Sequence, residues 1–355
     1  MAEVEARERK KSVTVESPVL DKVVKMETAD SDDTKGPEQS NTFEIIREKE
    51  PAAEGSAEQS NSAEDETITI DIDTEELDLN HNRLRNMDGL HQLRRIERLY
   101  LRWNLIKKIE NLESLTTLVE LELYDNQITV IENLDTLVNL EILDLSFNRI
   151  TEIQGLDKLL KLKKLYLCAN RISKVQNLSH LVNLTMLELG DNKIREIENI
   201  ETLVNLEQLY FGKNKINKIQ NLGTLKNLQI LSLQRNRLTK IENLEELTEL
   251  DQLFLSENGL TEIDGLTKNL NLTTLDLAQN KITKISNVSH LDKLEELWLN
   301  DNCIADWACV DELAKNKNLQ TIYLERNPLA SDVNYRRKIK LAVPWITQID
   351  ATSAR

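Results

Sequence analysis

Hydrophobic and polar positions repeat every 22 residues between residues 74 and 326 of the chain. Asparagines mark the register and stand at positions 82, 104, 126, 148, 170, 192, 214, 236, 258, 280 and 302. Apolar residues keep fixed distances from each asparagine, as in Leu118-x-x-Leu121-x-Leu123-x-x-Asn126-x-Ile128-x-x-Ile131. A further unit, Ile322-x-Leu324-x-x-Asn327, follows after a longer interval of 25 residues. We expect about twelve coils stacked side by side, because one such unit cannot bury its apolar face alone.

Two periodicities inside each repeat predict its local structure. Before the asparagine, Leu121 and Leu123 alternate with variable residues, which predicts a short strand with its leucines on one face. After the asparagine, Ile128 and Ile131 stand three residues apart, which predicts 3-10 turns or short helices. The pattern L-x-x-L-x-L-x-x-N resembles the leucine-rich repeat. This resemblance implies an α/β fold: a curved solenoid with a parallel sheet on the concave side and 3-10 or short helices on the convex side.

The leucines and asparagines are expected to be framework, with each asparagine satisfying backbone groups where a strand bends into its loop. A stack of coils also has two ends that need covering. Residues 67–72 alternate like a strand and are predicted to shield the first repeat. Residues 307–316 have apolar residues at helical spacing, which predicts a helix. Residues 327–355 are predicted to be a C-terminal cap, with these residues over the last coil: Tyr335, Ile339, Leu341, Trp345 and Ile349.

Residues 1–73 have a different composition, with 20 acidic residues, 9 basic residues and a single aromatic residue. Such a segment cannot bury enough apolar surface to fold, so we expect a disordered acidic tail. Ser12 follows a basic run and Ser17 precedes Pro18, which makes both serines candidate phosphorylation sites. The alternative is that these serines are incidental in a solvated tail.

The charge balance and the cysteines limit the classes of partner and location. The net charge of −16 argues against direct nucleic-acid binding, which needs clustered Lys and Arg to neutralise phosphates. No run of eighteen apolar residues is present, so no membrane span is expected. The first residues lack the apolar core of a signal peptide and the three cysteines show no framework spacing, so we expect an intracellular protein.

The variable strand positions are where we expect binding specificity. The position four residues before each asparagine is aromatic or acidic in eleven of twelve repeats: Asp78, Tyr100, Glu122, Asp144, Tyr166, Glu188, Tyr210, Ser232, Phe254, Asp276, Trp298 and Tyr323. Aromatic residues in a row on an exposed face are typical of interaction hot spots, and the acids favour a basic partner surface. The alternative is that Tyr and Phe are present only as good strand formers. We expect these core contacts: Asp144, Tyr166, Glu188, Tyr210, Phe254, Glu296, Trp298 and Tyr323.

Motifs of catalysis are missing from the sequence. It contains no G-x-x-x-x-G-K-[ST], no G-x-G-x-x-G after a strand, no H-E-x-x-H and no C-x-x-C. His180 and His290 occupy the same slot of two repeats, which indicates a framework role. Cys168 is predicted on the concave face as a contact or as a packed thiol. We therefore expect a binding protein with no catalytic residue, cofactor or metal.

The repeats, the acidic tail and the cap together closely resemble one family. The cap residues that carry the resemblance are Asn327-Pro-Leu, Tyr335-Arg-Arg and Pro344-Trp. With the 22-residue repeats they resemble the family of regulatory subunit 7 of type-1 serine/threonine protein phosphatase, over about residues 74–355. The resemblance implies a nuclear and cytoplasmic regulator that holds the phosphatase catalytic subunit on its concave face, with a further phosphatase inhibitor protein as a second partner.

The resemblance leaves several points open. Many regulators of this phosphatase dock through a short motif that ends in an aromatic residue, whereas the nearest match here, residues 11–15, ends in Val15. We therefore favour docking of the phosphatase on the concave face, and we expect this chain to be a monomer or part of a heterodimer. The effect on the phosphatase, whether inhibition, activation, maturation or relocation, does not follow from the residues. The 22-residue repeat is shared with spliceosomal and ciliary adaptors, so the alternative is a scaffold of a ribonucleoprotein or ciliary complex.

Overall fold

The structure is a computed structural model that describes residues 41–47 and 66–354. The two candidate phosphorylation sites, Ser12 and Ser17, and the short-motif match at residues 11–15 lie outside the described residues. Among the described residues, no helix has the length and hydrophobicity needed to cross a membrane.

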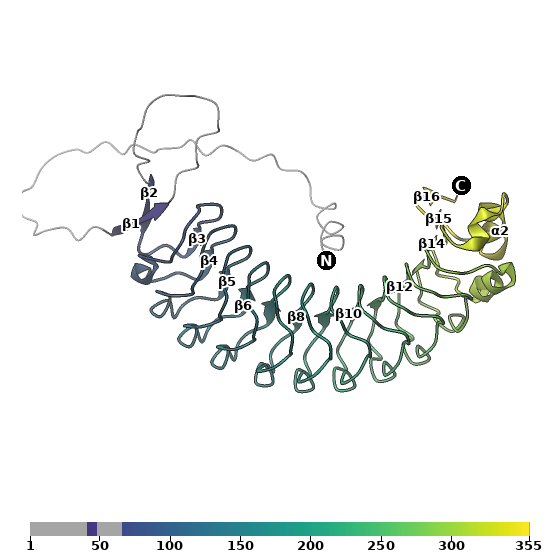
Figure 1. The fold of residues 1–355 in the computed structure, drawn as a ribbon, viewed down its shortest axis with the longest axis horizontal. Helices are drawn as coiled ribbons and strands as arrows, with labels where there is room; N and C mark the ends of the chain where they lie inside the picture. Colours follow the sequence, from purple (N-terminus) through teal and green to yellow (C-terminus); the bar gives the residue numbers. More distant parts are fainter. Residues whose placement is uncertain (1–40, 48–65, 355) are drawn as a thin grey trace, which may run out of the picture. The chain divides into compact units, whose positions relative to one another are not determined.

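The predicted solenoid is confirmed: the coils lie along one arc with short parallel strands on its inner edge (Figure 1). Each strand pairs with the strand of the next coil, residue for residue, so equivalent positions of successive repeats form straight rows. The strands are β3 (Glu76–Asp78), β4 (Arg98–Tyr100), β5 (Glu120–Glu122), β6 (Ile142–Asp144), β7 (Lys164–Tyr166), β8 (Met186–Glu188), β9 (Gln208–Tyr210), β10 (Ile230–Ser232), β11 (Gln252–Phe254), β12 (Thr274–Asp276), β13 (Glu296–Trp298) and β14 (Thr321–Tyr323).

The convex side of the inner coils consists of consecutive turns. Leu115 N–H donates to Leu112 O and Leu118 N–H donates to Leu115 O, each at 3.0 Å, which is the hydrogen-bond spacing of a 3-10 turn. These turns do not extend into helices, and regular 3-10 helices appear only near the ends of the described solenoid: η1 (Leu90–Gln92), η2 (Trp307–Lys315) and η3 (Pro328–Ser331). The helix expected at residues 307–316 is therefore present, in the 3-10 form.

The leucine and asparagine framework is confirmed by its contacts. Leu121 and Leu123 are fully buried between neighbouring coils. Asn126 Oδ1 accepts a hydrogen bond from Ile106 N–H at 3.0 Å, and its Nδ2 donates to Leu101 O at 2.9 Å. One amide therefore ties its own coil to the preceding coil, and the same contacts recur along the stack. Because the bonded backbone groups are buried, this row of asparagines stabilises the stack where unpaired groups would be costly.

A second row of asparagines, which the sequence reasoning missed, runs along the turns. Asn133 has a φ of 60° and donates from Nδ2 to Ile109 O in the preceding coil at 2.6 Å. The same φ and the same contact recur at Asn177, Asn199, Asn221, Asn243 and Asn287. Asparagine tolerates this left-handed conformation better than most residues, so it suits a turn that also needs a donor.

The N-terminal end is covered by two antiparallel strands, β1 (Thr42–Arg47) and β2 (Glu66–Asp71). Phe43 and Ile70 are paired in register and both are buried in the apolar core. Phe43 packs over Gly89, where an added Cβ would lie 3.0 Å from its ring. This confirms the shielding strand and corrects the expectation of disorder from residue 1 to residue 73 for the described residues 41–47 and 66–73.

The C-terminal end is closed by η3, by helix α2 (Tyr335–Ala342) and by two short strands, β15 (Gln348–Ile349) and β16 (Thr352–Ser353). β15 continues the parallel sheet and β16 pairs with it antiparallel. Of the five residues expected over the last coil, Ile339 and Ile349 are buried, and Tyr335 and Trp345 pack partly against the core. Leu341 is 70% exposed, because it lies on the outer face of α2, and that expectation is wrong.

Candidate protein-binding site on the concave sheet

The residues four positions before each asparagine form one continuous row, here called the central row. Strand register places Asp144 beside Tyr166, Tyr166 beside Glu188, and Glu188 beside Tyr210. Ser232, Phe254 and Asp276 continue the row to Trp298 and Tyr323. Seven of the eight expected contact residues therefore share one row, and the eighth, Glu296, stands two residues before Trp298 on the same strand.

The exposure of the central row is less than the sequence pattern indicates. Glu188 is 1% exposed, Tyr210 is 7% exposed and Phe254 is 8% exposed. Adjacent strands of a sheet lie about 4.8 Å apart, so large side chains in one row cover one another. By contrast, Tyr166, Trp298 and Tyr323 remain partly exposed. A partner on the concave face would thus contact only the outermost atoms of these packed side chains.

Carboxylates gather at the start of the row, on β5 and β6. Arg102 forms an ion pair with Glu122, which is buried. Burial and, to a smaller extent, the Glu122 carboxylate raise the pKa of Asp144 to about 6, against a hydrogen bond from Ser146 N–H that lowers it. Burial and Glu122 likewise raise the pKa of Glu120. The fold therefore holds negative charge here at a cost, which a cationic partner would relieve.

Cys168, which the sequence places on the concave face, stands two residues after Tyr166, beside the middle of the central row. Burial raises the pKa of the Cys168 thiol, and the neighbouring Glu188 carboxylate raises it further. A thiol held in its neutral form is a poor nucleophile. Cys168 is therefore a packed residue beside Glu188.

The C-terminal end of the row holds its largest aromatic pair. The Trp298 and Tyr323 rings meet edge to face, with centroids 5.6 Å apart. Glu296 Oε2 accepts a hydrogen bond from Trp298 Nε1 at 3.2 Å, and Gln348 Nε2 donates to the Tyr323 hydroxyl oxygen at 2.9 Å. Both rings are thus oriented by a polar neighbour while part of each face stays accessible.

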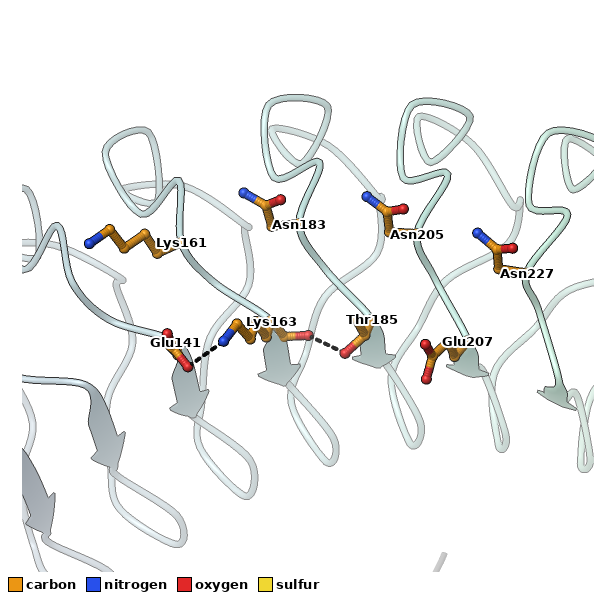
Figure 2. A pocket seen from close by; sticks show the side chains of 8 residues that line it. All are labelled: Glu141, Lys161, Lys163, Asn183, Thr185, Asn205, Glu207 and Asn227. Carbon is orange, nitrogen blue, oxygen red and sulfur yellow. Dashed lines mark hydrogen bonds and ion pairs between the residues drawn. The ribbon is translucent and has the colours of Figure 1, made fainter.

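A pocket with mixed charge lies along the segments that lead into the strands (Figure 2). Lys163 Nζ pairs with Glu141 Oε2 at 2.7 Å, and Thr185 Oγ1 donates to Lys163 O at 3.2 Å. Asn183 and Asn205, one in each coil, donate to backbone oxygens of the preceding coil at 2.8 and 2.9 Å. Because these side chains are bonded into the framework, we assign the pocket to the framework.

The histidines take the framework role that the sequence indicates. The Nε2 atoms of His180 and His290 lie 3.0 Å from Leu156 O and Leu266 O in the respective preceding coils. No group of three or more His, Cys, Asp or Glu side chains within residues 41–47 and 66–354 is arranged to hold a metal ion.

The sequence reasoning missed a set of aromatic residues beside the central row, at the rim where the strands end. His81, Trp103, Tyr124 and Phe147 form an unbroken chain of ring contacts across four repeats. They stand one or two residues before their asparagines, so a single column of the repeat alignment does not contain all four.

Comparison with family models assigns the solenoid. Models described as "Leucine Rich repeats (2 copies)" match residues 116–158, 138–180, 160–203, 182–224 and 204–246, and a model described as "Leucine-rich repeat" matches residues 241–353. Together these matches span more than half of the chain. The chain belongs to the leucine-rich-repeat family. Leucine-rich-repeat proteins are in general non-catalytic scaffolds suited to protein binding.

Solved structures show the same fold. A leucine-rich-repeat protein of Leptospira interrogans is 29% identical, with 78% of this chain and 72% of that chain covered and a TM-score of 0.71. An internalin of Listeria monocytogenes is 24% identical, with 81% of this chain and 90% of that chain covered and a TM-score of 0.65. Comparison with the curated proteins finds no match.

Proposed function

We propose that the chain is a non-catalytic regulatory subunit that binds the catalytic subunit of type-1 serine/threonine protein phosphatase on its concave face. The observation that supports this most is the central row, which is acidic or aromatic in eleven of twelve repeats, is held in strict register and ends on the Trp298 and Tyr323 pair. We name the phosphatase as the partner because the repeats, the tail and the cap resemble the family of its regulatory subunit 7.

The C-terminal aromatic pair has the physical properties of a hot spot. Trp and Tyr dominate protein interfaces because each buries a large apolar area and loses little side-chain entropy. Glu296 fixes the Trp298 indole and Gln348 fixes the Tyr323 phenol, so both rings are set before a partner arrives. Rings oriented in this way lower the entropic cost of binding.

The other end of the row supplies charge complementarity. The Glu122 carboxylate contributes to the raised pKa of Asp144, and Arg102 offsets only part of this effect. A basic patch on the partner would replace this repulsion with attraction. We infer a partner surface with apolar spots facing β13 and β14 and basic groups facing β5 and β6.

The test is a binding titration of the full chain with purified phosphatase catalytic subunit. The Trp298→Ala/Tyr323→Ala double variant should lose about 2 kcal/mol or more, which is about a 30-fold rise in Kd. Val182→Ala, an exposed change on the convex turns, is the matched control and should bind like the wild type. Equal affinity of the double variant and the wild type, with unchanged circular dichroism, would contradict the proposal.

A further inference from the structure

The four rim aromatics, here called the rim ladder, are consecutive neighbours in space. The His81 and Trp103 rings are stacked, with centroids 4.2 Å apart and planes 11° apart. Trp103 then meets the Tyr124 ring edge to face at 5.5 Å, and Tyr124 meets the Phe147 ring at 4.8 Å. Trp103 is 40% exposed and Phe147 is 45% exposed, so the ladder presents an apolar strip to solvent.

The fold does not require aromatic residues at these rim positions. His81, Trp103 and Phe147 all have a left-handed backbone, with φ values of 59°, 54° and 56°. The equivalent residue of other repeats has the same conformation and is Asp125, Ala169, Asp191, Lys213, Arg235, Glu257, Gln279, Asp301 or Arg326. Bulky side chains are disfavoured in this region of backbone space, so two exposed aromatic residues there oppose the local preference. Such exceptions concentrate at functional surfaces.

The charge around the rim ladder is strongly negative. On the concave and rim positions of the first four repeats, only Arg98 and Arg102 are basic, against six acids: Glu76, Asp78, Glu120, Glu122, Asp125 and Asp144. Both arginines are already paired, Arg98 with Glu76 at 3.3 Å and Arg102 with Glu122. The surface thus combines exposed rings with an excess of carboxylates.

One contact within the chain shows how an aromatic ring and a carboxylate together hold a cationic group. The Arg102 guanidinium carbon lies 5.8 Å from the centroid of the Tyr100 ring while the same guanidinium pairs with Glu122. A cation over an aromatic face with a carboxylate beside it is a favourable arrangement, and arginine forms it most readily. The rim ladder offers the same two elements, rings and carboxylates, to a cation from outside.

We propose that the rim ladder binds an extended segment of another protein that carries arginine or lysine side chains. The cationic groups stack over the Trp103 and Phe147 rings and pair with carboxylates such as Asp125. Single-stranded nucleic acid also stacks on aromatic rows, but it needs a basic groove, and the excess of carboxylates repels phosphates. This second site goes beyond the proposed phosphatase contact and does not rest on it.

The test uses the full chain and a displayed library of random 12-residue peptides. Selection on the immobilised wild type should enrich peptides with several Arg or Lys residues, and one enriched peptide is then synthesised. In a calorimetric titration, the Trp103→Gln/Phe147→Gln double variant should bind this peptide at least tenfold more weakly than the wild type. Asp125→Lys should also weaken it, by at least threefold, and added salt should lower the affinity of the wild type.

The controls separate the rim ladder from general attraction to an acidic chain. Val182→Gln, exposed on the convex turns, should bind the peptide like the wild type, and all variants should keep the wild-type circular dichroism and melting temperature. Several results would overturn the proposal: no enrichment of basic peptides, or equal affinity of the double variant and the wild type. The proposal would also be overturned if the wild type bound a twelve-nucleotide uridine oligomer, or dimerised with increasing concentration, and the double variant did not.

Discussion

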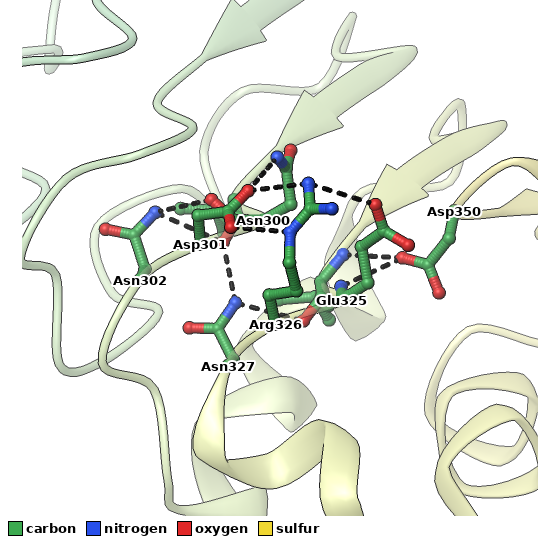
Figure 3. A network of polar contacts seen from close by, with 9 residues as sticks. Asn300, Asp301, Asn302, Glu325, Arg326, Asn327 and Asp350 are labelled. Atoms are coloured by element: carbon green, nitrogen blue, oxygen red, sulfur yellow. Dashed lines mark hydrogen bonds and ion pairs between the residues drawn. The ribbon is translucent and has the colours of Figure 1, made fainter.

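The Tyr335 hydroxyl donates a hydrogen bond of 3.1 Å to Asp350 Oδ1. The same oxygen accepts from the backbone N–H groups of Leu324 at 2.9 Å and Glu325 at 3.0 Å (Figure 3). In the coil before the cap, the equivalent N–H group of Leu299 donates instead to the backbone oxygen of Tyr323. The Asp350 side chain therefore supplies, in the C-terminal cap, the acceptor that a backbone oxygen supplies in the preceding coil. Tyr335, whose pKa is raised by burial and by the Asp350 carboxylate, holds this side chain in place.

This cap contact predicts a graded series of stabilities. Tyr335→Phe should lower the free energy of unfolding by about 1 kcal/mol, the net value of one hydrogen bond. Asp350→Ala should cost about 2 to 3 kcal/mol, because two backbone donors lose their partner. Asp350→Asn keeps the acceptor and should stay within about 1 kcal/mol of the wild type. Urea denaturation measures all three, with the exposed change Ser331→Ala as the control; a loss in Asp350→Asn as large as in Asp350→Ala would contradict this assignment.

The asparagine row predicts a contrast between two asparagine types. Asn148→Ala should lower the free energy of unfolding by about 3 kcal/mol, because Ile128 N–H and Leu123 O both lose a buried partner. Asn183→Ala removes a single exposed contact to Leu160 O and should cost less than about 1 kcal/mol. Chemical denaturation of both variants checks this, and equal losses would show that the buried row has no special weight.

Asp144 predicts a pH-dependent stability. Its pKa of about 6 lies above that of an exposed aspartate, so ionisation destabilises the folded chain as pH rises from about 4 through 6. Asp144→Asn stays neutral and should be more stable than the wild type by about 1 kcal/mol at pH 7.5, a value reduced for the partial exposure of the group. The difference should vanish at pH 4. Thermal unfolding of the wild type and the variant across this pH range measures the difference in stability, with the exposed change Asp157→Asn as the control. A difference that stays the same at every pH would contradict the prediction.

We predict that a thiol reagent at pH 8 labels Cys303 before Cys168. Cys303 is exposed and should react first. The raised pKa of Cys168 should make it slow, because burial and Glu188 both disfavour the thiolate. Glu188→Gln removes one of these causes and should speed the labelling of Cys168 severalfold. Mass spectrometry of timed samples identifies each site, and fast labelling of Cys168 in the wild type would contradict the packing described above.

The repeat framework could be predicted because its residues recur at fixed spacing. Leu121 and Asn126 have the same neighbours in every coil, so position in the repeat fixes both burial and hydrogen bonding. The row that carries the candidate site was predictable for the same reason. The depth of Glu188 was not, since its exposure depends on how the particular side chains of adjacent strands crowd it.

The ends and the rim ladder were harder to predict, for different physical reasons. β1 pairs with β2 across the intervening residues 48–65, and sequence periodicity does not reveal the partner of so short a strand. Leu341 is apolar yet exposed, because a helix of eight residues is too short for its periodicity to show which face is buried. The rim ladder joins Trp103 to Tyr124 from two different positions of the repeat, and only the folded backbone brings them together.

Each amide of the buried asparagine row reaches back to one coil and no further. The hydrogen bonds of one coil therefore do not depend on how many coils the stack contains. A whole 22-residue unit could be inserted or removed without disturbing any bond outside its two joints. The separation between the rim ladder at one end and the Trp298 and Tyr323 pair at the other is then simply a number of coils. Duplication of a single unit in evolution would therefore lengthen the distance between these two contact points by one coil and leave both contact surfaces unchanged.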